Sequence, residues 1–338
     1  MSIEINASKG IQQNTTEVTK IPVGTTAQRP ASPQAGMIRF NTDEGQVEGW
    51  NPTLERWQSV SEPFIIQATG GTITDVEQDG QLFRVHTFTS DGTFEVTRGG
   101  EVEHLIVAGG GAGSNSTAGG GGAGGLIYVG LERPSVQPFS SVASGVYPVV
   151  VGNGGDKGET AQSVGENGED SSVFGLTAIG GGRGAGNTGS SSGLPALDGG
   201  SGGGGSRSTS GTDHQHPTGG SALQPNSPSG GFGNRGGNVF NNEEAAGGGG
   251  AGEAGVDGDV GKGGDGLQYA ITGTPTFYAG GGAGSSGSNR VGGLGGGGDV
   301  DQGGEANTGG GGGGNRGNNS QTAAGGGSGI VIVRYRIG

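Results

Sequence analysis

Glycine is the residue that most constrains this chain, because it supplies 88 of the 338 residues and is unevenly placed. Residues 1–100 contain only 11 glycines, so the other 77 make the rest of the chain about one-third glycine. Glycine costs about 1 kcal/mol per helical position relative to alanine, so a long α-helix is not expected there. A collagen triple helix is excluded too, because glycine does not recur strictly at every third residue and only 13 prolines are present.

Glycine runs alternate with short non-glycine segments from residue 109 onward, as in HLIVAGGGAG and GGGSGIVIVRYRI. Such runs can adopt the polyproline II conformation, which makes no internal hydrogen bonds. Every N–H and C=O then needs a partner on a neighbouring segment, and only segments without side chains can approach closely on all sides. We therefore expect residues 109–338 to form a glycine-rich domain of packed polyglycine II helices flanked by strands. Disorder is the alternative, since the chain is 28% hydrophobic with a net charge of −14.

The remaining sequence predicts an all-β chain with essentially no α-helix, because no longer segment has the 3.6-residue period of an α-helix. Residues 1–35 are polar with three prolines and predict an extended arm. Residues 36–62 predict a small β module with strands near 37–41, 46–50 and 57–60. Residues 63–108 predict a second β module.

Three short strands cannot form an independent core, so identical copies of the first module are expected to pack together. The residues predicted to make these contacts between copies are Ile38, Phe40, Trp50 and Trp57.

The second module contains the sequence HTFTSDGTFEV, which predicts a hairpin closed by Ser90, Asp91 and Gly92. That register places Phe88 opposite Phe94. Residues 103–108 and 329–337 are both strand-like and are expected to lie side by side, where they close the glycine-rich domain.

No catalytic or cofactor site is predicted. The strand at residues 104–108 enters glycines as in a dinucleotide-binding unit, but Ser114 stands where the third glycine belongs and no helix can follow. Gly-x-Ser-x-Gly occurs at residues 189–193 and 199–203 without the strand and helix of a hydrolase elbow. Cysteine is absent, which excludes disulfides and cysteine metal sites. His214 and His216 are candidate metal ligands, with solvated loop residues as the alternative.

The charge and hydropathy exclude several partners. A pI near 4.6 argues against nucleic acid, because the phosphate backbone would be repelled. No apolar run approaches 18 residues, so membrane insertion is not expected. The first residues, MSIEINASKG, lack the basic and apolar regions of a signal peptide.

The order of these motifs resembles the glycine-rich domain of bacteriophage fibre and adhesin proteins. The motifs are the strand followed by GGGAG, then YPVVVGNGG, GEDSSVFGLTAIGGG, many glycine runs and the closing GIVIVRYRI. The arrangement is similar to the tip adhesins of T-even-like long tail fibres, in which loops between glycine helices bind the host receptor. GMIRFNTDEGQVEGW also resembles a short β motif of phage fibre and virion proteins. One difference is that this chain carries its own β modules and arm.

The resemblance implies a non-enzymatic virion fibre or adhesin, made in the host cytoplasm and carried on the tail or capsid surface. The arm would bind other virion proteins, the chain would be a homotrimer, and the receptor would be a host surface glycan or outer-membrane protein. A virion decoration or head-fibre protein without a dedicated receptor is the alternative.

Receptor contacts are expected in the segments that interrupt the glycine runs, because binding loops combine polar residues with a few aromatic ones. Phe277 and Tyr278 have an alternative role in capping the glycine segments. The residues predicted to contact a receptor are Leu223, Asn226, Phe232, Phe240, Asn241, Tyr269, Thr276, Phe277 and Tyr278.

Overall fold

The structure is a computed structural model that contains two compact units, Met1–Ile65 and Ile66–Gly338. It describes residues 4–6, 10–12, 21–52, 55–60, 65–115, 117–134, 137–158, 165–186, 194–206, 218–224, 231–240, 245–258, 261–285, 290–316 and 324–337. Within these ranges the regular elements are strands and one 3-10 turn, Thr26–Gln28. The predicted all-β fold class is therefore confirmed.

The first unit contains a strand pair and a four-stranded sheet. β1 (Glu4–Asn6) pairs with β2 (Gly10–Gln12). The four-stranded sheet has the order β3-β4-β5-β6, with bounds Val23–Gly24, Ile38–Asn41, Gln46–Asn51 and Arg56–Ser59. The three predicted strands are present, but part of the predicted arm, residues 23–28, is folded into this unit as β3 and the 3-10 turn. β3 joins the sheet parallel to β4, and the Phe40 N–H donates to the Pro22 carbonyl at 2.8 Å.

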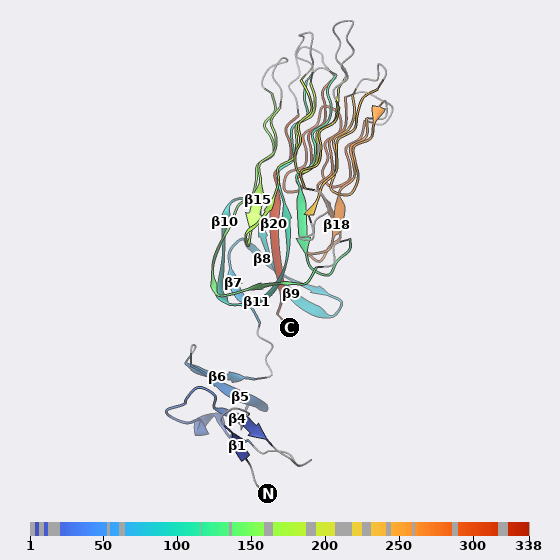
Figure 1. Cartoon of the computed structure of the whole chain (residues 1–338). Helices are drawn as coiled ribbons and strands as arrows, with labels where there is room; N and C mark the ends of the chain where they lie inside the picture. Colours follow the sequence, from blue (N-terminus) through green and yellow to red (C-terminus); the bar gives the residue numbers. More distant parts are fainter. Residues whose placement is uncertain are drawn as a thin grey trace. The chain divides into compact units, whose positions relative to one another are not determined.

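The second unit begins with a sandwich of two sheets (Figure 1). The larger sheet has the order β17-β12-β11-β20-β9-β8, with β13 paired to β11, and the smaller sheet has the order β14-β10-β7. The strand bounds of the larger sheet are β8 Thr72–Gln78, β9 Gln81–Phe88, β11 Gly100–Val107, β12 Leu126–Val129, β13 Ser140–Val142, β17 Gly231–Phe232 and β20 Ile330–Arg336. Those of the smaller sheet are β7 Gln67–Thr69, β10 Gly92–Arg98 and β14 Gly145–Val149.

The central strands confirm one long-range prediction. β11 pairs antiparallel with β20 along residues 103–107 and 330–334, although more than 200 residues separate them. The β9 strand pairs with the other side of β20. Residues 63–108 are therefore not a separate module, because their strands share one sheet with the end of the chain. Burial on both faces explains why residues 105–107 of β11 and 330–333 of β20 are unbroken runs of apolar residues.

The predicted hairpin around Ser90 and Asp91 is wrong. β9 pairs with β8 and β20, whereas β10 pairs with β7 and β14, so the turn carries the chain from one sheet to the other. Phe88 and Phe94 both belong to the core between the sheets and are not paired across a hairpin. Both strands have apolar residues pointing inward, so the local pattern does not distinguish a hairpin from a corner between packed sheets.

Two short hairpins complete the strands of the second unit. β15 (Ser171–Val173) pairs with β16 (Leu176–Ala178), and β18 (Leu267–Tyr269) pairs with β19 (Thr276–Tyr278). The β18–β19 hairpin packs on the face of the larger sheet opposite the smaller sheet, where Tyr269 stacks on Tyr128 at 4.3 Å between ring centroids.

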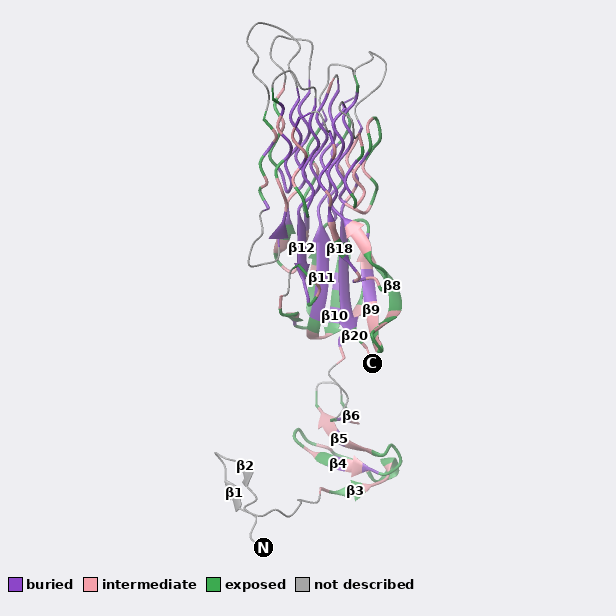
Figure 2. Ribbon diagram, turned by 90° about the vertical axis from the view of Figure 1, so that its right-hand side faces the viewer, coloured by how far each residue is buried: buried purple, intermediate pink, exposed green. Residues whose placement is uncertain are grey.

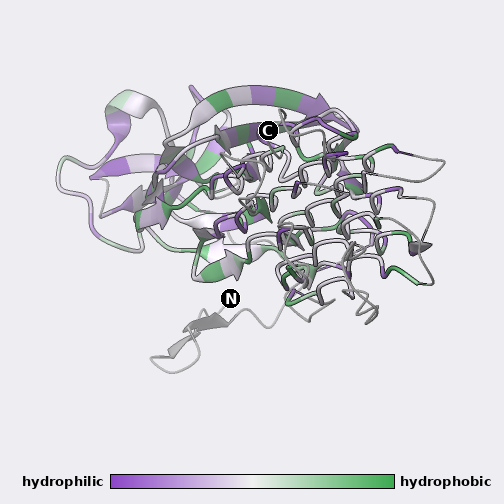
Figure 3. Ribbon diagram, turned by 90° about the horizontal axis from the view of Figure 1, so that it is seen from above, coloured by the Kyte–Doolittle hydropathy of each residue, from purple (hydrophilic) through white to green (hydrophobic). Residues whose placement is uncertain are grey.

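Beyond the sandwich, the glycine-rich chain runs back and forth as many near-parallel segments (Figures 1 and 3). We call this bundle the glycine lattice. Its inner segments are buried and its outer ones are partly exposed (Figure 2). The segment 118–125 enters β12 directly and is buried throughout; we call it the central segment.

Backbone hydrogen bonds from the central segment repeat every third residue. Gly119, Gly122 and Gly125 donate to one neighbouring segment, at 2.9, 2.8 and 2.8 Å. Gly120 and Ala123 donate to a second neighbouring segment, and Gly121 and Gly124 donate to a third. The carbonyls of the central segment accept from three further segments. The neighbours that accept its bonds are 179–186, 245–251 and 309–316, and those that donate to it are 108–115, 200–206 and 279–285.

Glycine is required in this packing because neighbouring carbonyl oxygens occupy the space of a side chain. A methyl group built at Gly121 would overlap the oxygen of Gly111, and one at Gly119 would overlap the oxygen of Gly204. These obstacles are backbone atoms held by their own hydrogen bonds, so they cannot rotate away. The lattice is therefore a core made of main chain, in contrast to the side-chain core of the sandwich.

Candidate functional site

The glycine lattice has one end at the sandwich and one end away from it, and we call the second the distal end. The segment that leaves β11 reaches Ser114, and the segment that leads to β12 begins near Ala118. These residues are joined to equivalent positions of other segments. The Ser285 N–H donates to the Ala118 carbonyl at 2.9 Å, and the Asn315 N–H donates to the Ser114 carbonyl at 3.0 Å. Ser206 and Ala245 form a further bridge.

We call Ser114, Ser206, Ser285 and Asn315 the distal layer. All four are buried, and each ends a glycine run that ascends from the sandwich side. The Ser114 hydroxyl donates to the Gly184 carbonyl at 2.7 Å. The Ser114 hydroxyl thus satisfies a main-chain carbonyl near the end of the lattice, whereas the buried Ser285 hydroxyl has no hydrogen-bond partner among the described residues. This layer was not predicted from the sequence, although a Ser or Asn directly after each of four glycine runs is a signal for it.

Several described segments stop and resume at residues close to this layer. The structure describes residues up to Gly186, Ser206, Phe240, Ser285 and Arg316, and resumes at Leu194, Thr218, Ala245, Arg290 and Ala324. The predicted residues His214, His216, Asn226 and Asn241 lie outside the described residues, so their roles stay predictions.

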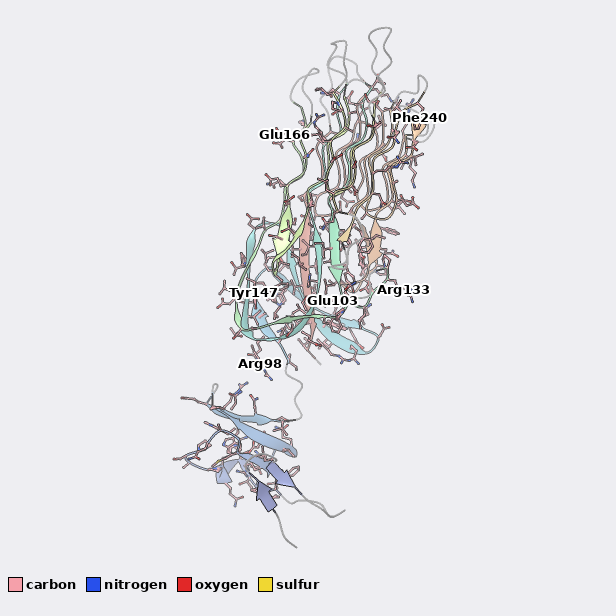
Figure 4. The ribbon with its side chains drawn as sticks, in the orientation of Figure 1. Arg98, Glu103, Arg133, Tyr147, Glu166 and Phe240 are labelled. Carbon is pink, nitrogen blue, oxygen red and sulfur yellow. The ribbon has the colours of Figure 1, made fainter. Side chains whose placement is uncertain are left out.

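Phe240 is the one predicted receptor-contact residue that the structure describes at the distal end (Figure 4). Its side chain is 50% exposed, while the preceding Val239 is buried. The adjoining outer surface is polar: Arg235 contacts Asp257 through two hydrogen bonds of 2.7 and 3.0 Å. Arg235 holds the pKa of Asp257 below its usual range, so this carboxylate stays charged at neutral pH.

Three other predicted receptor residues are core residues instead. Phe232, Tyr269 and Tyr278 are 8%, 1% and 4% exposed and pack in the cluster on one face of the larger sheet. Burial raises the pKa of both tyrosines. These side chains cannot contact a receptor, because aromatic residues beside a large apolar sheet gain more from burial than from exposure. The prediction that these residues contact a receptor is wrong. Their neighbours in the sequence are polar or glycine, so the local pattern did not indicate a buried strand.

The remaining candidates lie near the sandwich rather than at the distal end. Thr276 and Phe277 belong to β19 and are partly buried. Leu223 is 52% exposed, and its N–H donates to the Gly199 carbonyl at 2.7 Å. The next residue, Gln224, accepts from the Ile179 N–H beside β16. The predicted receptor residues that the structure describes are therefore not gathered into one surface.

The predicted contacts between copies fall on two faces of the first unit's sheet. The registers Ile38–Gly49 and Phe40–Val47 place Ile38 and Phe40 on one face, where Ile38 is 49% exposed. Trp50 pairs with Trp57 on the opposite face, with the two rings edge to face at 6.0 Å.

The second face holds a buried polar cluster around Glu48. Arg29 and Arg39 form ion pairs with this carboxylate at 2.5 and 3.4 Å. The hydrogen bond from Arg29 keeps the pKa of Glu48 below its usual range. One face of the sheet is therefore apolar and the other contains buried charged groups. A single apolar interface between copies can include Ile38 and Phe40 but not the two tryptophans.

A second buried polar network lies in the sandwich near the end of β20. Arg334 pairs with Glu103 at 2.5 Å and with Glu132 at 3.3 Å, and the Tyr128 hydroxyl donates to Glu103. Burial raises the pKa of Glu132. Each of these charged groups already has a partner, so the network fixes β11 against β20 and residue 132. Its geometry is that of a structural ion pair.

The described residues contain neither a cluster of metal-ligating side chains nor a membrane-spanning helix. No group of three or more histidine, aspartate or glutamate side chains is placed to hold a metal ion within the described ranges. Among the same residues, no helix is long and apolar enough to cross a membrane.

Comparison with known proteins places the larger unit in a family. No curated protein matches the chain. A family model described as a glycine-rich domain matches residues 87–336, which include most of the sandwich strands and the whole glycine lattice. Since this match covers well over half of the sequence, the chain belongs to the glycine-rich domain family.

Proposed function

We propose that this protein is a bacteriophage fibre or adhesin that binds a host receptor through segments displayed at the distal end of the glycine lattice. The observation that carries the proposal is the construction of the lattice itself. Neighbouring segments are joined by main-chain hydrogen bonds at nearly every residue, and the chain leaves the described part repeatedly beside one buried layer. A rigid frame that holds several connecting segments at one end suits recognition.

We further propose that the glycine segments are polyglycine II helices. The three-residue hydrogen-bond period matches the three residues per turn of this helix. No glycine of the central segment has a positive φ. At about 3.1 Å per residue, the seven residues from Ala108 to Ser114 would raise the distal layer roughly 20 Å above the sandwich.

The sequences that connect the segments at this end support recognition of a polar surface. Residues 207–217, 241–244, 286–289 and 317–323 read RSTSGTDHQHP, NNEE, SGSN and GNNSQTA. Serine, threonine and asparagine provide adaptable hydrogen bonding, as they do in antibody paratopes. A host surface glycan or the exposed part of an outer-membrane protein is the class of receptor that this composition fits.

Oligomerisation is part of the proposal. The face with Ile38 and Phe40 also carries Val23 and Val60, which are 66% and 54% exposed. The other face of this small sheet buries polar groups, so the described part of the unit has no buried apolar core of its own. Copies of the chain, most simply three around an axis, would bury the exposed face. The N-terminal residues would then attach the fibre to other virion proteins.

The test is binding of the purified protein to host cells, in competition with phage adsorption. An adhesin blocks adsorption, and replacing residues 207–217 with a Gly-Ser segment of equal length reduces the blocking. A decoration or head-fibre protein would instead bind capsids and leave adsorption unchanged. Antibody labelling of intact particles in the electron microscope separates the two locations.

A further inference from the structure

A groove opens at the edge of the sandwich, away from the distal end. It has a volume of about 610 Å³ and lies where β13, β14 and the β15–β16 hairpin meet. This volume falls within the range of ligand sites in proteins, roughly 300–1,000 Å³. Four hydroxyl side chains and two aromatic rings line most of it: Ser140, Ser141, Ser172, Thr177, Tyr147 and Phe174.

The aromatic rings form a fixed wall. Tyr147 donates its hydroxyl hydrogen bond to the Ala143 carbonyl at 3.0 Å, and its ring meets Phe174 edge to face at 5.1 Å. Phe174 in turn packs on the buried Phe94 and His104, at 5.8 and 5.3 Å. Tyr147, which points to the side of the sandwich in Figure 4, is only partly buried. The Tyr147 ring is therefore held in place by the hydrogen bond of its hydroxyl group and by its packing against Phe174.

The turn of the β15–β16 hairpin shows that Phe174 is held against a backbone preference. Phe174 has φ 54° and is followed by Gly175 with φ 76°, the geometry of a two-residue turn that favours Asn-Gly. A bulky residue at positive φ is strained. Packing on Phe94 and His104 offsets this strain and keeps the ring at the groove.

The chemistry of the lining selects the class of ligand. Among the described residues, no carboxylate, ammonium, guanidinium or imidazole group lines the groove, so none of them offers an opposite charge to a charged ligand. Hydroxyl side chains donate and accept hydrogen bonds, as sugar hydroxyls do. The partly exposed tyrosine ring offers an apolar surface with a polar edge for the C–H face of a sugar.

A peptide that adds a strand to the sheet is less suitable. β14 is the edge strand of the smaller sheet, and Pro148 in β14 has no N–H to donate to an added strand. The groove therefore favours contacts with side chains over pairing with another main chain.

We propose that this groove binds a neutral oligosaccharide. Tyr147 stacks on a sugar ring, and the hydroxyls of Ser141, Ser172 and Thr177 bond its hydroxyl groups. The site lies beside the sandwich and uses no residue of the distal layer, so it is a second binding site and does not depend on the proposed receptor segments.

Isothermal titration of the full-length protein with maltohexaose, cellohexaose and mannohexaose tests the proposal, with hexagalacturonic acid as the charged counterpart. At least one neutral hexasaccharide is expected to bind. Tyr147→Ala and Thr177→Arg should each weaken that binding about tenfold or more, the second by filling the groove from an exposed position. Val146→Arg is the matched control, because Val146 is 67% exposed on the same strand but does not line the groove.

The proposal is overturned if no neutral hexasaccharide binds, if hexagalacturonic acid binds equally well, or if binding survives both groove variants. Thr177→Arg changes an exposed residue and should fold normally. It therefore tests the groove even if Tyr147→Ala fails to fold. Competition with phage adsorption, measured on the same Thr177→Arg protein, reports on the distal segments separately. Loss of sugar binding with adsorption competition intact would separate the two sites.

Discussion

The sandwich and the glycine lattice adjoin in one unit but are stabilised by opposite means. In the sandwich, side chains such as Phe94, Leu105 and Ile332 fill the core and the backbone bonds lie within sheets. In the lattice, the core consists of main-chain N–H and C=O groups, and the side chains buried among them are mostly the single methyl groups of alanines such as Ala112, Ala123 and Ala283. Removing side-chain atoms should therefore destabilise the sandwich, and adding side-chain atoms should destabilise the lattice.

This difference explains how so few apolar residues support a folded unit of this size. Apolar burial is concentrated in the two side-chain clusters on either face of the larger sheet. Beyond them, hydrogen bonds between neighbouring segments must offset the large loss of glycine backbone entropy. Each such bond contributes only about 1 kcal/mol net, so many must form together.

The largest expected effect is truncation of the sandwich core. Phe94 is fully buried against His86 and Phe174, at 5.1 and 5.8 Å between ring centroids. Phe94→Ala leaves a cavity there and should lower the free energy of unfolding by about 3–5 kcal/mol. Urea denaturation measures the loss. A loss below about 1 kcal/mol would contradict a side-chain core.

The next effect is addition of one methyl group inside the lattice. Gly121→Ala places its Cβ on the carbonyl oxygen of Gly111, and the free energy of unfolding should fall by about 3 kcal/mol. Gly303→Ala is the matched control, since its Cβ would lie 3.4 Å from the nearest atom, the Gly325 oxygen. The control should stay within about 1 kcal/mol of the wild type. Equal thermal stability of the two variants would refute the main-chain core.

Acid should weaken the sandwich before the lattice, because His104 is fully buried and neither of its ring nitrogens has a hydrogen-bond partner in the described part of the chain. Burial lowers the pKa of His104 to about 4, against an unfolded value near 6.5. The unfolded chain therefore binds the proton first, and stability falls as the pH drops from about 6.5 to 4. At pH 5 the loss from this residue is about 2 kcal/mol.

The His104→Phe variant isolates this contribution, since it keeps a ring beside Phe174 but cannot titrate. Unfolding midpoints between pH 7 and pH 5 should change less in the variant than in the wild type. Part of the pH dependence should remain, because burial also lowers the pKa of His86. An unchanged pH profile would show that His104 is not buried in its neutral form.

The smallest effect concerns ion pairs on the outside of the lattice. Arg235 and Asp257 are 47% and 38% exposed, and their pair is screened by water. Asp257→Asn should cost less than about 1 kcal/mol, and 1 M salt should have a comparably small effect on thermal unfolding. A large salt dependence would mean that charges, and not main-chain bonds, hold the outer segments.

Much of the fold could be predicted because it follows from strong local signals. The apolar runs of β11 and β20 predict buried strands, and both occur at the junction with glycine, which supports their pairing. The placement of β9 and β10 in different sheets could not be predicted. Inward-facing phenylalanines are equally compatible with a hairpin and with a turn that connects two packed sheets. The same holds for Tyr269 and Tyr278, whose burial depends on a sheet distant in the sequence.

By itself the sequence determined that glycine is the building material of residues 109–338, since no other residue leaves main chains free to approach from every side. Only the tertiary structure decided which segment lies beside which, and therefore where the distal layer and the lateral groove are formed. The physical reason is that bare backbones are chemically identical. The neighbours of each segment are fixed by the strands and connections at its ends, and not by any side chain that the segment carries.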